Sequence, residues 1–153
     1  MAPIATDAEV QVDDQAIRAA LERHWSDIND EDVVHEIYHD DVVLEFPQGG
    51  ERLVGRTNVR AMRDAYPSWL ALRTERIRGS GDLWVAENTI TYDGKPMHTV
   101  NIMEFRDSKV VRETIYFGDP WEPPAWRAQW VELVERVAQP VGQETADGPW
   151  SDG

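Results

Sequence analysis

Apolar residues in the first part of the chain recur at the three- and four-residue spacing of amphipathic helices. This spacing predicts a helix from Asp13 to Ile28, capped by Asp13, whose inward stripe is Ile17, Leu21, His24, Trp25 and Ile28. Asp30 can cap a second, short helix that ends at the His39-Asp40-Asp41 cluster and has the apolar side Val33, Val34, Ile37 and Tyr38. Two helices are therefore expected before the first strand.

A short strand and a third helix follow. Residues 42–46 alternate as a strand does, and Pro47 closes it. A glycine-containing loop then leads to Thr57, which can cap a third helix that places Val59, Met62 and Tyr66 inward and stops at Pro67. Three helices are thus predicted ahead of the main sheet.

From Leu72 onward the pattern changes to β-branched and aromatic residues separated by turn residues. The expected strands are 72–78, 83–92, 97–105 and 110–117. Asp93-Gly94 is the strongest hairpin signal, because the tight primed turn needs positive φ at both central residues. The four strands predict an antiparallel meander.

The end of the chain predicts a last helix and a tail. Pro123-Pro124 opens a helix whose stripe is Trp126, Trp130, Leu133, Val134 and Val137. We expect a flexible N-terminus over 1–12, one domain over 13–137 and a disordered tail over 138–153 that is rich in Gly and Asp. The predicted class is one α+β domain, with helices over a curved antiparallel sheet.

The amino-acid composition excludes several classes of binding partner and site. With 29 acidic against 15 basic residues, the formal net charge of −14 repels nucleic-acid phosphates and anionic lipid, so neither nucleic acid nor membrane is an expected partner. The chain has no cysteine, which excludes disulfides, thiol nucleophiles and thiolate metal sites. No segment resembles a signal peptide or a membrane span, which favours a cytoplasmic location.

Several short motifs, in their order, resemble the SnoaL-like polyketide-cyclase family of the nuclear transport factor two-like superfamily. The resemblance covers residues 16–117, and the motifs that carry it are Tyr38-His39-Asp40-Asp41-Val42, the Gly50 to Arg56 loop, Met103-Glu104-Phe105 and the segment from Val110 to Phe117. It implies a cone-shaped fold in which the helices cross the concave face of the sheet and leave a pocket at the wide end. Members of the superfamily include isomerases, cyclases, dehydratases, epoxide hydrolases and binding domains, so the fold does not select a function.

The string His35-Glu36-Ile37-Tyr38-His39 matches a zinc-binding pattern in which two imidazoles lie one helical turn apart. The predicted helix is short, it ends at His39, and the extended pattern with a third histidine is missing. We therefore expect His35 and Glu36 on a solvated face, Tyr38 in the core and no metal, and we keep a zinc site as the distant alternative.

The fourth and fifth strands carry the better candidates. Alternation places Thr99, Asn101 and Met103 on one face and His98, Val100 and Ile102 on the other. Residues 100–105 resemble the ketosteroid isomerase segment in which an acid donates a hydrogen bond to the enolate, and Asn101 falls at that acid. The same matching directs Glu113 into the pocket. An amide can donate to an oxyanion, and a carboxyl among apolar walls suits acid–base chemistry, whereas the structural alternatives are a satisfied buried amide and a glutamate paired with an arginine.

The resemblance also shows departures from the isomerase. Its catalytic base would fall at Phe46 and its helix-one tyrosine near Glu22, so steroid isomerisation by that mechanism is not expected. The Asp-Arg-Asp set of the related epoxide hydrolases does not occur on residues 97–105. For a rim carboxylate or imidazole of the cyclase type, Asp119, Glu113 and His98 are the candidates, while His24 on the apolar face of the first helix is expected to be a core histidine.

Two functions remain open. The first is a cofactor-independent acid–base enzyme, of cyclase, isomerase or hydrolase type, that acts on an apolar carbonyl or polyketide-like substrate; the second is a binding or interaction domain with the same pocket. The expected catalytic residues are Asn101, Glu113, Asp119 and His98. The expected ligand-binding residues are Tyr38, Phe46, Met62, Tyr66, Trp84, Asn88, Ile90, Met103, Ile115, Phe117 and Trp121.

The tryptophan-rich segment after Phe117 is expected to form either a lid over the pocket or a packing contact. The outer face of the sheet is expected to form the contact of a homodimer.

Overall fold

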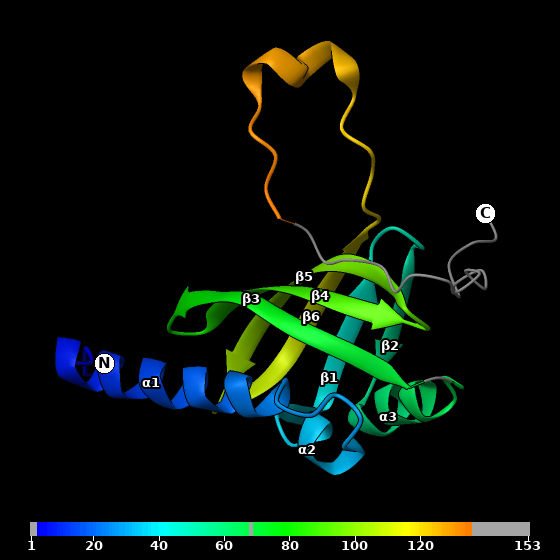
Figure 1. The fold of residues 1–153 in the computed structure, drawn as a ribbon. Helices are drawn as coiled ribbons and strands as arrows, with labels where there is room; N and C mark the ends of the chain where they lie inside the picture. Colours follow the sequence, from blue (N-terminus) through cyan, green and yellow to red (C-terminus); the bar gives the residue numbers. More distant parts are fainter. Residues whose placement is uncertain (1–2, 68, 136–153) are drawn as a thin grey trace.

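The computed structural model describes residues 3–67 and 69–135, and within them a curved six-stranded sheet carries three α-helices on one side (Figure 1). In chain order the elements are α1 (Asp7–His24), α2 (Glu31–His35), β1 (Tyr38–Phe46), β2 (Glu51–Val54), α3 (Arg56–Asp64), β3 (Leu70–Ser80), β4 (Leu83–Tyr92), β5 (Lys95–Arg106), β6 (Lys109–Gly118) and a 3₁₀ helix, η1 (Ala125–Trp130).

The strand order is β2-β1-β6-β5-β4-β3. All pairs are antiparallel except β1 and β6, which run parallel with Leu44 opposite Glu113. The predicted meander is therefore confirmed for β3 to β6, and the sheet as a whole is mixed. The parallel pair arises because the chain crosses to the far edge after α3, so β6 meets β1 without a hairpin between them.

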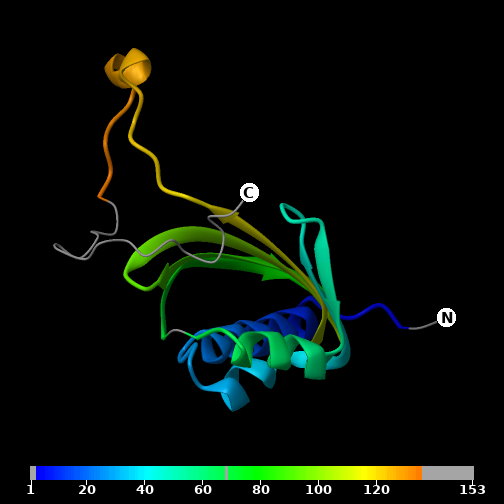
Figure 2. The same ribbon diagram turned by 90° about the vertical axis from the view of Figure 1, so that its right-hand side faces the viewer.

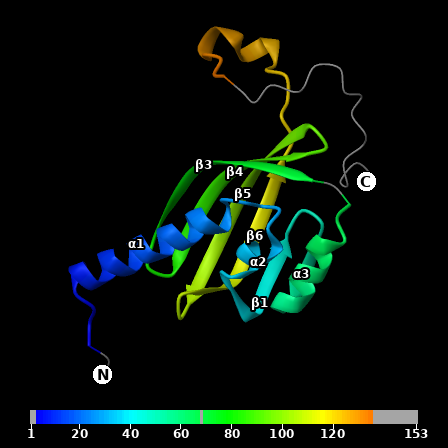
Figure 3. The ribbon, with the colours of Figure 1, turned by 60° about the horizontal axis from the view of Figure 1, so that its bottom comes forward.

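The helices cover the concave side of the sheet, as Figure 2 shows, and the predicted α+β fold is confirmed. α1 packs against β3 and α3 against β1, and Figure 3 shows both helices lying across the strands. The core between the layers includes the fully buried Leu21, Leu44, Val59 and Val110. None of the described helices has the length and apolarity needed to cross a lipid bilayer.

Helix and strand boundaries differ from the sequence expectation around residues 7 and 38. α1 begins at Asp7, inside the segment 1–12 that was expected to be flexible, because Asp, Ala, Glu and Gln there are compatible with a helical start. α2 ends at His35 and β1 already begins at Tyr38, which pairs with Val110 of β6. Pairing with β6 thus extends the strand into residues whose local spacing fits a helix equally well.

The predicted loop before the third helix contains strand β2. Its residues pair with β1, with Leu53 opposite Leu44, so the segment forms a hairpin on the edge of the sheet. Gly55 follows with a φ of 92°, a conformation that glycine adopts without strain, and α3 starts at Arg56 rather than after a Thr57 cap. The Asp93-Gly94 turn has φ values of 49° and 81°, which confirms the predicted hairpin.

The segment after β6 differs most from its prediction. It contains only the short η1, and Trp126 and Trp130 are 73% and 71% exposed. Figures 1 and 2 show this arm extending away from the sheet and helices. The predicted amphipathic helix is absent over the described residues up to Glu135, because a short helix needs a surface against which to bury its stripe. Val137 and the expected tail over 138–153 lie outside the described residues.

Candidate functional site

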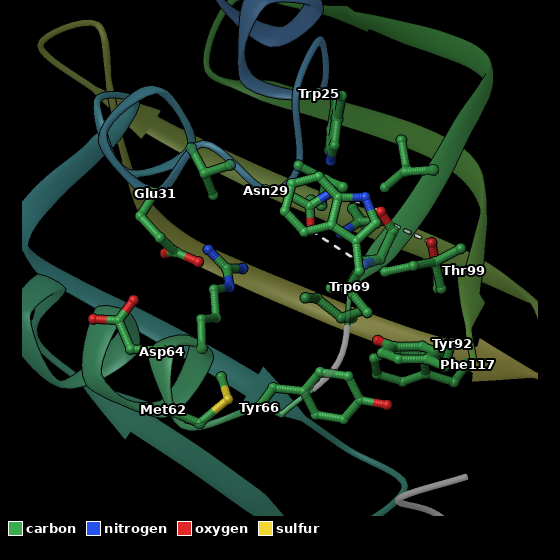
Figure 4. Close-up of a pocket in the computed structure, with 18 of the residues that line it drawn as sticks. Trp25, Asn29, Glu31, Met62, Asp64, Tyr66, Trp69, Tyr92, Thr99 and Phe117 are labelled. Atoms are coloured by element: carbon green, nitrogen blue, oxygen red, sulfur yellow. Dashed lines mark hydrogen bonds between the residues drawn. The ribbon is translucent and has the colours of Figure 1, made fainter. Parts of the chain in front are cut away.

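A cavity of about 820 Å³ lies between the concave face of the sheet and the helices. Its volume is in the range of sites that enclose drug-sized molecules, about 300 to 1,000 Å³. Aromatic side chains from both layers form much of its wall. Figure 4 shows Trp25, Tyr66, Trp69, Tyr92 and Phe117, and Phe46 also lines the cavity. Such walls favour a flat, largely apolar guest.

A chain of buried polar side chains forms the floor of this cavity. The Asn101 amide nitrogen donates to Glu113 Oε2 at 2.9 Å, and the Asn101 oxygen accepts from the Asn88 amide at 3.0 Å and from the Thr99 hydroxyl at 3.2 Å. The Tyr38 hydroxyl donates to the other Glu113 oxygen, Oε1, at 2.5 Å. These contacts fix the orientation of the Asn101 amide and occupy both carboxylate oxygens.

The register of β5 determines which residues reach this floor. Thr99, Asn101 and Met103 are buried, whereas His98 and Val100 are exposed on the outer face. Glu113 lies opposite Met103 on β6 and points to the same side as Asn101. A shift of one residue would have reversed all these directions, so the alternation in the sequence correctly separated the two faces.

Arg63 of α3 joins the network and was missed in the sequence. Its Nη2 donates to the Tyr38 hydroxyl at 3.0 Å, lies 3.8 Å from Glu113 Oε1, and the guanidinium stands 5.2 Å from the centre of the Tyr38 ring. Its other terminal nitrogen, Nη1, is buried and has no hydrogen-bond partner among the described residues. The signal in the sequence was the four-residue spacing from Val59, which puts Arg63 on the inward face of α3.

Burial keeps the hydroxyls of this site neutral. It raises the pKa of Tyr38 well above its ordinary value, although Arg63 acts in the opposite direction, so Tyr38 remains a donor to Glu113. Burial also raises the pKa of Tyr92 to about 12. Tyr92 contacts Tyr66 edge-on, with ring centres 5.3 Å apart, at one side of the cavity.

His24 lines the cavity as a neutral imidazole. Its Nδ1–H donates to the Val34 carbonyl oxygen at 2.8 Å, because a carbonyl can only accept. Burial, with a smaller effect of Arg63, lowers the pKa of His24 to about 3. The sequence expectation of a core histidine agrees with this hydrogen bond and burial.

A second group of charged residues lies at the α2 and α3 side of the cavity. Glu31 and Asp64 both line it, and Figure 4 shows their carboxyl groups on the same side of the pocket. Glu31 Oε2 is buried and has no hydrogen bond to any described residue, although His35 Nδ1 lies 3.4 Å away. Sequence reasoning missed both carboxyls because they belong to different helices that meet only in the folded chain.

Comparison with known proteins assigns the family. The model of the SnoaL-like domain family matches residues 15–113 of this chain. The chain belongs to the SnoaL-like domain family. Among solved structures, an NTF-2 like protein of unknown function from Burkholderia xenovorans LB400 is 46% identical, with 81% of this chain and 99% of that chain covered and a TM-score of 0.77. The resemblance inferred from the sequence is confirmed.

Two further structures share the fold of this SnoaL-like domain. A putative ketosteroid isomerase from Kribbella flavida DSM 17836 is 24% identical over 80% of this chain and 92% of that chain, with a TM-score of 0.71. An LEH-like epoxide hydrolase from M. tuberculosis is 21% identical over 68% of this chain and 83% of that chain, with a TM-score of 0.55. No curated protein gave a significant match.

Several residues that were expected at the pocket of this SnoaL-like domain lie elsewhere. His98, Asp119 and Trp121 are exposed and do not line the cavity, because His98 is on the outer face and the other two follow the end of β6. Trp84 and Met103 point to the concave side but lie in the core, where they are opposite each other on β4 and β5. The expected residues that do line the cavity are Phe46, Met62, Tyr66, Ile90, Asn101, Glu113, Ile115 and Phe117.

Tyr38 and Asn88 reach the site indirectly. Both are buried, and neither lines the cavity. They act on the lining residues through hydrogen bonds, Tyr38 to Glu113 and Asn88 to Asn101. Tyr38 and Asn88 were expected to contact a ligand directly, but they instead support the residues that line the cavity.

The zinc pattern does not form the geometry that it requires. α2 ends at His35, and His39 lies in β1, so the two imidazoles are not one helical turn apart. His35 is buried rather than solvated, and its Nδ1–H donates to the Glu31 carbonyl oxygen at 2.7 Å. Among the described residues, no group of three or more His, Asp or Glu is arranged to hold a metal ion.

Proposed function

We propose that this SnoaL-like domain binds a small, mainly apolar carbonyl compound, of polyketide-like character, and converts it by acid–base chemistry without a cofactor. The observation that carries this proposal is the buried Arg63 Nη1 at the cavity, which has no hydrogen-bond partner within the described chain. A buried donor without an acceptor is costly, and a substrate oxygen would supply the acceptor.

Asn101 supplies the second donor toward the substrate oxygen. Its amide has two hydrogens, of which the contacts in the described structure use one, in the bond to Glu113. The second hydrogen and Arg63 Nη1 would hold a carbonyl oxygen and stabilise negative charge that develops on it. Because Asn88, Thr99 and Glu113 already orient the amide, little reorganisation is needed when the charge appears.

Glu113 has a supporting role in this proposal. It lines the cavity but is completely buried, and its two oxygens already accept from Tyr38 and Asn101. We therefore assign it as a positioning residue that holds Asn101 and balances the charge of Arg63, rather than as the acid or base suggested by the strand pattern.

Binding can be tested with two probes that differ only in the carbonyl group, 2-tetralone and tetralin. Fluorescence titration reports on them because Trp25 and Trp69 line the cavity. We expect 2-tetralone to bind at least about tenfold more tightly, since a hydrogen bond to a charged group is worth about 1.5–3 kcal/mol. Arg63→Met should reduce this preference to the part that Asn101 supplies, whereas Arg60→Met, on the same helix and paired with Asp32 at 2.8 Å, should keep it in full. Equal affinities in the wild type would contradict the proposal.

The alternative function is a binding domain without catalysis. The observation that favours it is the pairing of Glu113, whose oxygens are both occupied and which lies 3.8 Å from Arg63. The two functions differ in one measurement, the exchange of the α-hydrogens of 2-tetralone in D₂O followed by NMR. An enzyme of the proposed kind accelerates this exchange over buffer, and a pure binding domain does not.

A further inference from the structure

Glu31 stands out among the ionisable groups of the cavity because it is a partly exposed carboxyl group at the cavity wall beside a second carboxyl group, Asp64. It belongs to the first turn of α2, lines the cavity, and its side chain is 33% exposed. Its Oε2 is buried and accepts no hydrogen bond from any residue that the structure describes. The neighbouring His35 Nδ1–H donates to the Glu31 backbone carbonyl at 2.7 Å, and the same nitrogen lies 3.4 Å from Oε2.

The groups that face Glu31 come from both packed helices. They are Asp64, Arg63 and Arg60 of α3, and His35 of its own helix. Burial raises the pKa of Glu31, and Asp64 raises it further through its charge and a hydrogen bond between the two side chains, while the two arginines oppose this effect. Burial also lowers the pKa of His35, so this imidazole adds no positive charge near neutral pH.

The cavity therefore combines two complementary unpaired groups. Arg63 Nη1 is a donor without an acceptor, and Glu31 Oε2 is an acceptor without a donor, and both residues line the same space. A carbonyl compound bound there would present its oxygen to the first and an adjacent C–H group to the second. Proton removal next to a carbonyl requires a donor for the oxygen and a base for the adjacent carbon, and the cavity wall contains one residue of each kind.

We infer that Glu31 is the proton-transfer residue of this pocket, an inference that rests on the proposed function. The Glu31 carboxylate takes a proton from the carbon next to the bound carbonyl, and the electrons of the broken C–H bond form the enolate. The negative charge of the enolate rests on the oxygen held by Arg63 and Asn101. Return of the proton from the Glu31 carboxyl group to carbon restores the residue, so the step needs no further reactant.

The test is the exchange of 2-tetralone α-hydrogens in D₂O by the full chain and its Glu31→Gln variant. General acid–base catalysis contributes about 10²- to 10⁴-fold, so we expect the variant to lose at least about 100-fold in rate. Its fluorescence titration with 2-tetralone should stay within threefold of the wild type. Asp32→Asn is the matched control, because Asp32 is adjacent, exposed and outside the cavity, and its rate should be unchanged.

The pH profile separates proton transfer from a structural role. Asp64→Asn removes a negative charge next to Glu31, so the acid limb of the exchange rate should move to lower pH. Glu31→Asp, which keeps the carboxyl group, should recover part of the rate. If Glu31→Gln binds the probe and exchanges it at the wild-type rate, the inference is overturned and the proposed function stands. If the wild type binds but does not accelerate exchange, both are overturned.

Discussion

At the scale of single residues, His24 makes the stability of this domain dependent on pH. Its folded-state pKa of about 3 lies below the ordinary value of 6.5, so the unfolded chain takes up the proton first as the pH falls. Stability should then decrease by about 1.4 kcal/mol per pH unit between pH 6.5 and about 3, and be fully present above pH 6.5.

Urea unfolding at a series of pH values measures this effect. His24→Asn keeps a side-chain donor for the Val34 carbonyl but does not titrate, so its unfolding free energy should fall less steeply with decreasing pH. Parallel curves for the wild type and the variant would show that His24 is not the group responsible.

Glu113 is the centre of the buried network, and its charge should matter for stability. Glu113→Gln removes the carboxylate that lies 3.8 Å from Arg63. The new amide NH₂ group would also face either Tyr38 or Asn101, and both of these side chains are already hydrogen-bond donors. Removal of one partner from a buried ion pair costs about 3–5 kcal/mol, and the partial exposure of Arg63 favours the lower end. Thermal or urea unfolding measures the loss. Glu104→Gln, on the exposed face of β5, is the control and should change stability by less than about 0.5 kcal/mol.

The sequence predicted some of these residues and not others, for a physical reason. Asn101 and Glu113 lie on strands, where alternation alone assigns a face, and the structure places both at the cavity. Arg63 and Glu31 lie on helices, and their neighbours, Tyr38 and Asp64, come from other elements. Charged residues on helices usually face water, so the spacing of Arg63 from Val59 is a weak signal and the tertiary packing is needed to show that both residues are partly enclosed.

At the scale of elements, the tight β3–β4 hairpin depends on Gly79. A methyl group at this position would lie 2.5 Å from the Leu83 carbonyl oxygen and 2.7 Å from the Trp84 Cα. Gly79→Ala should therefore lower the unfolding free energy by about 2 kcal/mol, as overpacking does. Gly118→Ala, at the end of β6, meets no described atom within 4 Å and should be nearly neutral. Equal effects of both changes in urea unfolding would contradict this explanation.

Element boundaries were predictable where local chemistry decides them. The Asp93-Gly94 turn and the strands on either side of it follow from residue preferences alone. The start of β1 at Tyr38 follows from pairing with β6, which is far away in sequence. The hydrogen bond between Tyr38 and Glu113 of β6, for example, joins residues that are 75 positions apart. The expected C-terminal helix failed because its apolar stripe has no surface of the described chain to cover.

At the scale of the whole molecule, we propose that the outer sheet face forms a homodimer. Val100 and Tyr116, which pair across β5 and β6, are 37% and 43% exposed on this face. Burial of apolar surface is favourable by about 25 cal/mol per Å². Val100→Lys should shift the protein to monomer in light scattering at micromolar concentration, whereas Val54→Lys on β2 should not. A wild type that is monomeric throughout would remove this proposal.

The proposed chemistry of the cavity depends on where a carbonyl oxygen binds. A crystal structure of the chain with 2-tetralone bound tests this most directly. We predict the ketone oxygen within hydrogen-bond distance of Arg63 Nη1 and the Asn101 amide, with its ring system between the aromatic walls. An oxygen directed to the Tyr66 and Tyr92 side of the cavity, with Arg63 Nη1 still unpaired, would contradict the proposed roles of Arg63 and Asn101.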